Sequence, residues 1–198
     1  MEGRKLTINL KKANTFSIVL FVGTAFVALV ATKLIWGEAF NVKSVINPIM
    51  PPESDAEQKG ALVVLLKAAL LIGLLIGGIV VHELIHGITW AMFAPKGWKS
   101  ISFGVMWKLL TPYCHCDEPM IIRHYIWGAL TPLIFLGILP LIGGIAFADP
   151  NSLVFGIIFT SAAAGDIMVV WLLRHEDAFS EVLDHPSEAG CIVYDKKH

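Results

Sequence analysis

The chain has 198 residues, of which 56% are hydrophobic and only 16% are charged, and its mean hydropathy is +0.69. This composition excludes an ordinary soluble domain, in which about a quarter of the residues are charged. The formal net charge of -1 gives no basic face for nucleic acid, so the lipid bilayer is the expected partner and nucleic acid is not.

Four apolar segments reach the length of roughly 20 residues that a helix needs to cross the hydrocarbon layer. They cover residues 16–36, 61–94, 126–148 and 152–173. The first is longer than the apolar part of a signal peptide and has no small-residue cleavage site, so we expect it to be retained. The sequence therefore predicts an all-α membrane protein with four transmembrane helices, in which residues 1–198 form one membrane domain.

Basic residues predict the orientation of these helices. They gather before the first span, between the second and third, and after the fourth, at Arg4, Lys5, Lys11, Lys12, Lys96, Lys99, Lys108, Arg123, Arg174, Lys196 and Lys197. An even number of spans brings these regions to one side, which the positive-inside rule identifies as the cytoplasm. We expect a multi-pass protein of the plasma membrane with cytoplasmic N- and C-termini and an extracytoplasmic first loop at 37–60.

The segment between the second and third spans differs from the rest. From Ser100 to Trp107 small or polar residues alternate with apolar ones, which is the period of a strand. Irregular or extended backbone is tolerated at membrane depth only where protein or a wet cavity surrounds it. We therefore expect a short β-hairpin or re-entrant segment at the cytoplasmic face.

The second span contains His82, Glu83 and His86 in the pattern H-E-x-x-H. Histidines four residues apart project from the same helical face, so both imidazoles can bind one Zn2+. Zinc lowers the pKa of a bound water toward about 7, and the adjacent Glu83 is then suited to accept its proton as general base. Charged residues are costly inside a membrane, which favours a functional role over a polar contact between helices.

A zinc site needs a third protein ligand, and Asp166 is the only acidic residue in the interior of the fourth span. Measured along each helix from the basic residue that ends it, Asp166 lies at nearly the same depth in the membrane as His82 and His86. An ion pair of Asp166 with Lys67 or Lys33 is the alternative, but these lysines lie at other depths or extend to the surface.

These residues carry a resemblance to a known family. The H-E-x-x-H helix, the strand-like insert, the helix with Gly128 to Pro132 and the helix with Gly165–Asp166 together resemble the putative zincin peptidase family of small membrane proteins. They are more distantly similar to intramembrane metalloproteases of the site-2 protease type. The resemblance covers residues 61–175 as a metalloprotease-like core, and it implies that Asp166 completes the zinc site. An Asn of the site-2 protease pattern is absent after Thr131–Pro132.

The sequence thus predicts a zinc-dependent peptidase that hydrolyses a polypeptide, such as a membrane protein, with metal-activated water. The alternative is a non-enzymatic membrane protein that binds or carries a divalent metal, or a polar helix-packing cluster without metal. Cys114, His115 and Cys116 offer soft ligands, but they lack the second pair of a structural zinc site. Pro132 and Pro140 are expected to kink the third span.

Overall fold

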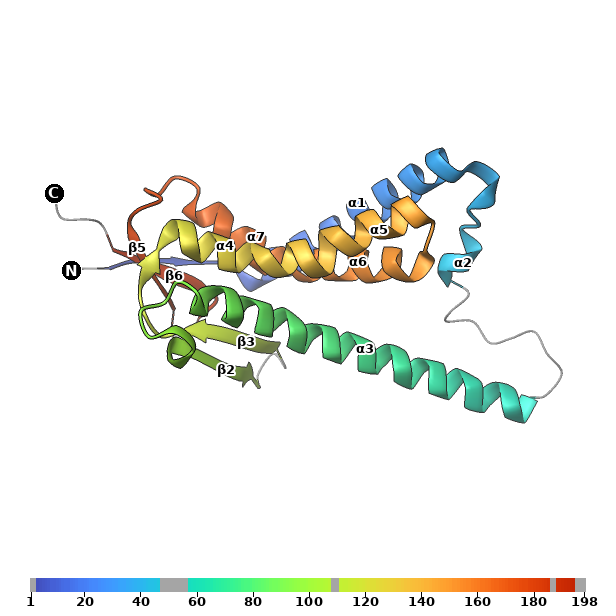
Figure 1. The fold of residues 1–198 in the computed structure, drawn as a ribbon, viewed down its shortest axis with the longest axis horizontal. Helices are drawn as coiled ribbons and strands as arrows, with labels where there is room; N and C mark the ends of the chain where they lie inside the picture. Colours follow the sequence, from blue (N-terminus) through green and yellow to red (C-terminus); the bar gives the residue numbers. More distant parts are fainter. Residues whose placement is uncertain (1–2, 47–56, 108–110, 186–187, 195–198) are drawn as a thin grey trace.

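A computed structural model of the protein describes residues 3–46, 57–107, 111–185 and 188–194. Long helices form an elongated bundle, and the strands gather at one end of it (Figure 1). The first and last strands lie side by side at this end. Part of the predicted first loop, residues 47–56, and the basic residues Lys108, Lys196 and Lys197 lie outside the described residues.

The predicted spans correspond to helices with slightly different bounds. They are α1 (Leu10–Trp36), α3 (Glu57–Ala91), the continuous run of α4 (Ile122–Pro132), the π-helix η3 (Leu133–Ile138) and α5 (Leu139–Phe147), and the pair α6 (Pro150–Ala162) and α7 (Ala164–Leu173). Short helices are η1 (Gly37–Ala39), α2 (Lys43–Ile46) and η2 (Gly97–Ser100). Within the described residues, three helices are long and apolar enough to cross a membrane, or four if the pair α6–α7 is one span.

Two of these helices depart from a regular predicted span. The third continues past Pro132 through η3, in which the N–H of Leu139 bonds to the carbonyl of Ile134, five residues back. Pro140 has no N–H for a regular helical bond, and the π-helical segment directly before it disturbs the α-helical pattern. The single helix predicted over 152–173 is wrong, because the chain bends by 44° between α6 and α7. The bend places Asp166 in the first turn of α7, where free N–H groups favour a carboxylate.

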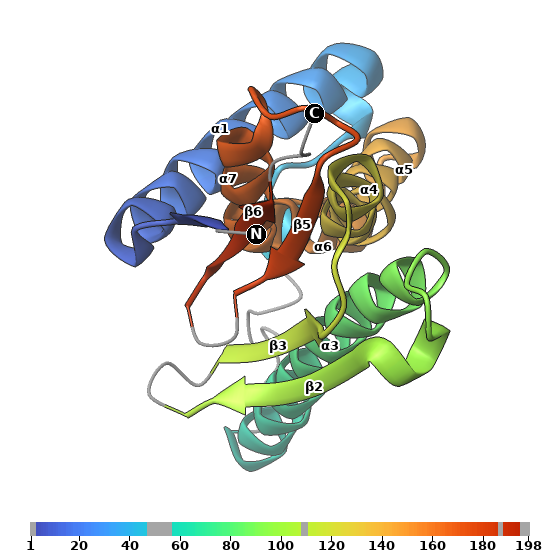
Figure 2. The same cartoon turned by 90° about the vertical axis from the view of Figure 1, so that its left-hand side faces the viewer.

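The all-α prediction is incomplete, because the described residues also form two antiparallel sheets. β1 (Arg4–Thr7), β6 (Gly190–Tyr194), β5 (Glu181–Asp184) and β4 (Met120–Ile121) form a four-stranded sheet in this order. β2 (Ile101–Met106) and β3 (Thr111–Cys116) form the predicted hairpin, in register from Ile101 opposite Cys116 to Met106 opposite Thr111. Figure 2 shows this hairpin lying across α3. β5 and β6 lie on the side of β3 that is away from β2.

The interior of the strand-bearing end is the main hydrophobic core. Val182 and Val193 of the sheet are fully buried with Ile122 of α4 and Leu173 of α7. The opposite end of the bundle is held by a smaller cluster around Ala28 and Leu153. From Ala61 to Val81, by contrast, α3 is almost wholly exposed, as expected for an apolar helix that faces lipid.

The Glu118 carboxylate connects the loop before β4 to the segment around η2 that follows α3. It forms an ion pair with Lys96 and accepts hydrogen bonds from the backbone N–H of Lys96, at 3.0 Å, and from the Ser100 hydroxyl. The Lys96 side chain is the largest of the causes that lower the pKa of Glu118 to about 2. A lowered pKa means that this carboxylate stabilises the fold above its ordinary pKa of 4.5 and loses that effect as the pH falls toward 2.

Glu118→Gln is therefore expected to lower the midpoint of thermal unfolding at pH 7, because the ion pair is lost. The difference from the wild type should shrink as the pH falls from 4.5 toward about 2. Circular dichroism in detergent measures both midpoints. A difference that stays constant over this range would contradict a role for the carboxylate charge.

Candidate metal centre

His82 and His86 lie one helical turn apart on α3, and their imidazole rings are nearly perpendicular to one another. The Nε2 atoms of His82 and His86 are 3.2 Å apart, and both residues are buried. His86 Nδ1 donates a hydrogen bond to the carbonyl oxygen of Gly128 at 2.8 Å. Because a carbonyl oxygen can only accept, Nδ1 carries the proton in neutral His86 and Nε2 is left with a lone pair.

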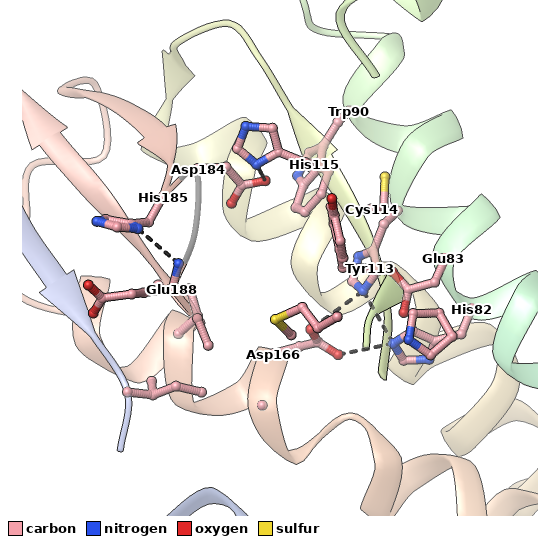
Figure 3. A pocket seen from close by; sticks show the side chains of 18 of the residues that line it. His82, Glu83, Trp90, Tyr113, Cys114, His115, Asp166, Asp184, His185 and Glu188 are labelled. Atoms are coloured by element: carbon pink, nitrogen blue, oxygen red, sulfur yellow. Dashed lines mark hydrogen bonds and ion pairs between the residues drawn. The ribbon is translucent and has the colours of Figure 1, made fainter. Parts of the chain in front are cut away.

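Asp166 reaches the two histidines from the facing helix α7. Its Oδ2 lies 3.2 Å from His82 Nε2, and its Oδ1 lies 3.4 Å from His86 Nε2. One ligand atom from each of the three residues lies within 4.8 Å of the others. Figure 3 shows the Asp166 carboxylate pointing toward His82. Among the described residues, no other group of this kind is found.

This arrangement fits a divalent metal ion. A single proton between the Nε2 atoms and the carboxylate satisfies only one pair of atoms at a time, whereas a cation can bind all three ligands. His82 Nδ1 is buried without a hydrogen-bond partner in the described structure. Two imidazoles and a carboxylate are also the ligand set of catalytic zinc sites, which leave a position open for water or substrate.

Glu83 lies beside this group, and the hairpin holds its side chain. The backbone N–H of Cys114 in β3 donates a hydrogen bond to the Glu83 carboxylate. The hairpin can approach α3 closely because of Gly87, where an added Cβ would lie 2.6 Å from the Phe103 ring and 3.3 Å from Cys114 Sγ. The predicted hairpin thus orients the carboxylate next to the two histidines.

A second close approach brings α4 against the same face of α3. A Cβ at Gly128 would lie 1.9 Å from Trp90 Nε1, so only a hydrogen atom fits there. This contact allows the Gly128 carbonyl to reach His86. Any larger residue at this position has to displace Trp90, whose ring stacks on His86 at a centroid distance of 5.1 Å.

The histidines, Glu83 and Asp166 line a cavity of about 440 Å3. Pro112 to His115 of the hairpin line this cavity, and so do Asp184, the last residue of β5, and His185 and Glu188, which lie between β5 and β6 (Figure 3). No local pattern links Asp184, His185 or Glu188 to the H-E-x-x-H helix, so the sequence does not predict them at the site. These residues reach the site because β5 pairs with β4 and β6 pairs with β1.

The other candidates from the sequence do not join the group. Lys33 forms an ion pair with Glu38 at 3.0 Å, not with Asp166. His115 lies 3.2 Å from Asp117 and 3.6 Å from Asp184. Burial raises the pKa of the Cys114 thiol, and Cys114 is not part of the group formed by His82, His86 and Asp166.

Comparison with known proteins identifies the family. A family model described as putative zincin peptidase matches residues 75–178, which is more than half of the chain. The match includes His82, Glu83, His86 and Asp166 and ends before β5. No curated protein and no solved structure matches the chain. The chain therefore belongs to the putative zincin peptidase family.

Proposed function

We propose that the protein is a zinc-dependent peptidase that hydrolyses a polypeptide within or next to the membrane. The observation that carries this proposal is the convergence of His82, His86 and Asp166 from two facing helices beside Glu83. Membership of a zincin peptidase family supports the same chemistry. The metalloprotease-like core is proposed to comprise residues 61–175, with α1 as an accessory helix.

In this proposal His82, His86 and Asp166 hold the zinc ion. The ion, when bound, supplies a Lewis acid that polarises the scissile carbonyl and makes water acidic enough to react at neutral pH. The Glu83 carboxylate accepts a proton from the attacking water and then returns it to the leaving amine. The Cys114 N–H keeps the carboxylate oriented, and the Gly128 carbonyl keeps His86 in the tautomer whose Nε2 is free.

The cavity suits a short stretch of extended polypeptide. Its volume of about 440 Å3 falls in the range of pockets that enclose small ligands or a few residues of a chain. Residues of β3 line one part of the cavity, and His185 and Glu188 near the C-terminus line another. A membrane protein is the proposed substrate, because the site lies on helices long and apolar enough to span a bilayer.

The proposed location is the plasma membrane, with the N- and C-termini in the cytoplasm. The antiparallel pairing of β1 with β6 is consistent with an even number of crossings, with α6 and α7 counted as one span. Lys96, Lys99 and Arg123 follow the positive-inside pattern. Fusion of a reporter that is active on only one side of the membrane tests the orientation, and activity outside the cytoplasm would contradict it.

Elemental analysis of the full chain in detergent, together with a peptide-hydrolysis assay, tests the function. We expect about one zinc ion per chain, as a single group of three ligands predicts. Hydrolysis should disappear on treatment with a chelator and return when Zn2+ is added back. Protein that is folded but takes up no zinc would contradict the proposal.

A further inference from the structure

Behind the proposed zinc site, three aromatic rings stand in a row. The Trp90 ring stacks on His86 at 5.1 Å with an interplanar angle of 16°, and the Tyr125 ring stacks on Trp90 at 5.3 Å and 13°. Trp90 Nε1 also donates a hydrogen bond to the Tyr125 backbone carbonyl at 3.1 Å. Trp90 and Tyr125 are both buried. Trp90 therefore packs between His86 and Tyr125, so the position of Tyr125 limits how the His86 ring can tilt.

Tyr125 is in turn fixed by Asp184, the last residue of β5. The Tyr125 hydroxyl donates a hydrogen bond to Asp184 Oδ1 at 2.5 Å. Asp184 is buried, and this burial raises the pKa of its carboxyl group. Burying a carboxyl group costs free energy unless its oxygen atoms are hydrogen-bonded. Among the described residues of the four-residue strand β5, Asp184 is the only buried polar one.

The same carboxyl group also holds the strand that carries the contact to Glu83. Asp184 Oδ2 accepts a hydrogen bond from the backbone N–H of Cys116 at 3.1 Å. Two residues earlier in β3, the N–H of Cys114 donates to Glu83. N–H groups two residues apart on a strand point to the same side, so Asp184 and Glu83 bind the same edge of β3.

From this geometry we infer that Asp184 and Tyr125 are positioning residues for the proposed peptidase site. Asp184 acts on His86 through Tyr125 and Trp90, and on Glu83 through β3. The C-terminal hairpin of β5 and β6 thus helps to orient the metal ligand His86 and the base Glu83. This hairpin lies beyond the matched residues 75–178. The inference rests on the proposed function, because it concerns the same zinc site.

The test compares metal binding in full-length Tyr125→Phe, Asp184→Leu and Asp184→Asn proteins. Tyr125→Phe keeps the stacked ring and removes only the hydroxyl, Asp184→Leu removes both acceptors, and Asp184→Asn keeps an acceptor oxygen. Glu181→Gln, on the exposed side of the same strand, is the matched control. The zinc dissociation constant is measured by competition with a chelator, and the visible spectrum of Co2+-loaded protein reports the ligand geometry.

We expect Tyr125→Phe and Asp184→Leu to weaken zinc binding by about 10- to 100-fold and to change the Co2+ spectrum, as loss of outer contacts does at other metal sites. Asp184→Asn should recover most of the affinity, and Glu181→Gln should match the wild type. If Asp184→Leu does not fold, Tyr125→Phe decides alone. Unchanged zinc affinity and Co2+ spectrum with a lower unfolding midpoint would overturn the inference alone. A wild type that binds no zinc would overturn the proposed function as well.

Discussion

Glu83→Gln is expected to lower the rate of peptide hydrolysis by roughly 10²- to 10⁴-fold while the protein keeps its zinc. Gln has nearly the size of Glu, and its side-chain oxygen can still accept the hydrogen bond from the Cys114 N–H. It cannot take up a proton from water. The loss should therefore appear in kcat, with little change in the dissociation constant for zinc.

The same variant separates the peptidase from its alternatives. Glu38→Gln replaces an exposed acid elsewhere in the chain and is the control for loss of a carboxylate. A metal carrier would keep its transport in Glu83→Gln, and a polar packing cluster would show lower stability with no change in metal content. Full hydrolysis by Glu83→Gln would mean that another group serves as the base.

The parts of the fold that could be predicted are those with a local periodic signal. Helix α3 follows from a long apolar run, and its two histidines share a face because they are four residues apart. The hairpin follows from the alternation between Ser100 and Trp107. The depth of Asp166 in an apolar segment predicts that it meets the histidines, and in the structure it lies within 3.4 Å of both.

The parts of the fold that the sequence does not predict depend on contacts between distant segments. β1 and β6 come from opposite ends of the chain, and β4 has only two residues, so none of these strands shows a clear period of two. Asp184 belongs to a four-residue strand whose neighbours are set by that pairing. Its contact with Tyr125 joins residues 59 positions apart and cannot be read from the sequence.

The break between α6 and α7 is not predictable from the sequence for a different reason. Ala162, Ala163 and Ala164 are strong helix formers, and no proline separates the two helices. The contacts at the site explain the bend, because it places the first turn of α7 next to His82 and His86. Tertiary contacts here override a local preference for one continuous helix.

Asp166→Ala is expected to weaken zinc binding by more than about 100-fold, since loss of a direct ligand should exceed the effect of losing an outer contact. The two remaining imidazoles would still lie on α3, because one helical turn fixes their spacing. They would lose the carboxylate of α7 that lies within 3.4 Å of both of them.

The decisive measurement for Asp166→Ala is the effect of added Zn2+ on thermal unfolding. A ligand at 100 times its dissociation constant stabilises the native state by about 2.7 kcal/mol, so the wild type should unfold at a clearly higher temperature with zinc. Asp166→Ala should show almost no shift at the same zinc concentration, whereas Glu38→Gln should respond like the wild type. An equal shift in Asp166→Ala would remove Asp166 from the ligand set, because zinc would then be held without it.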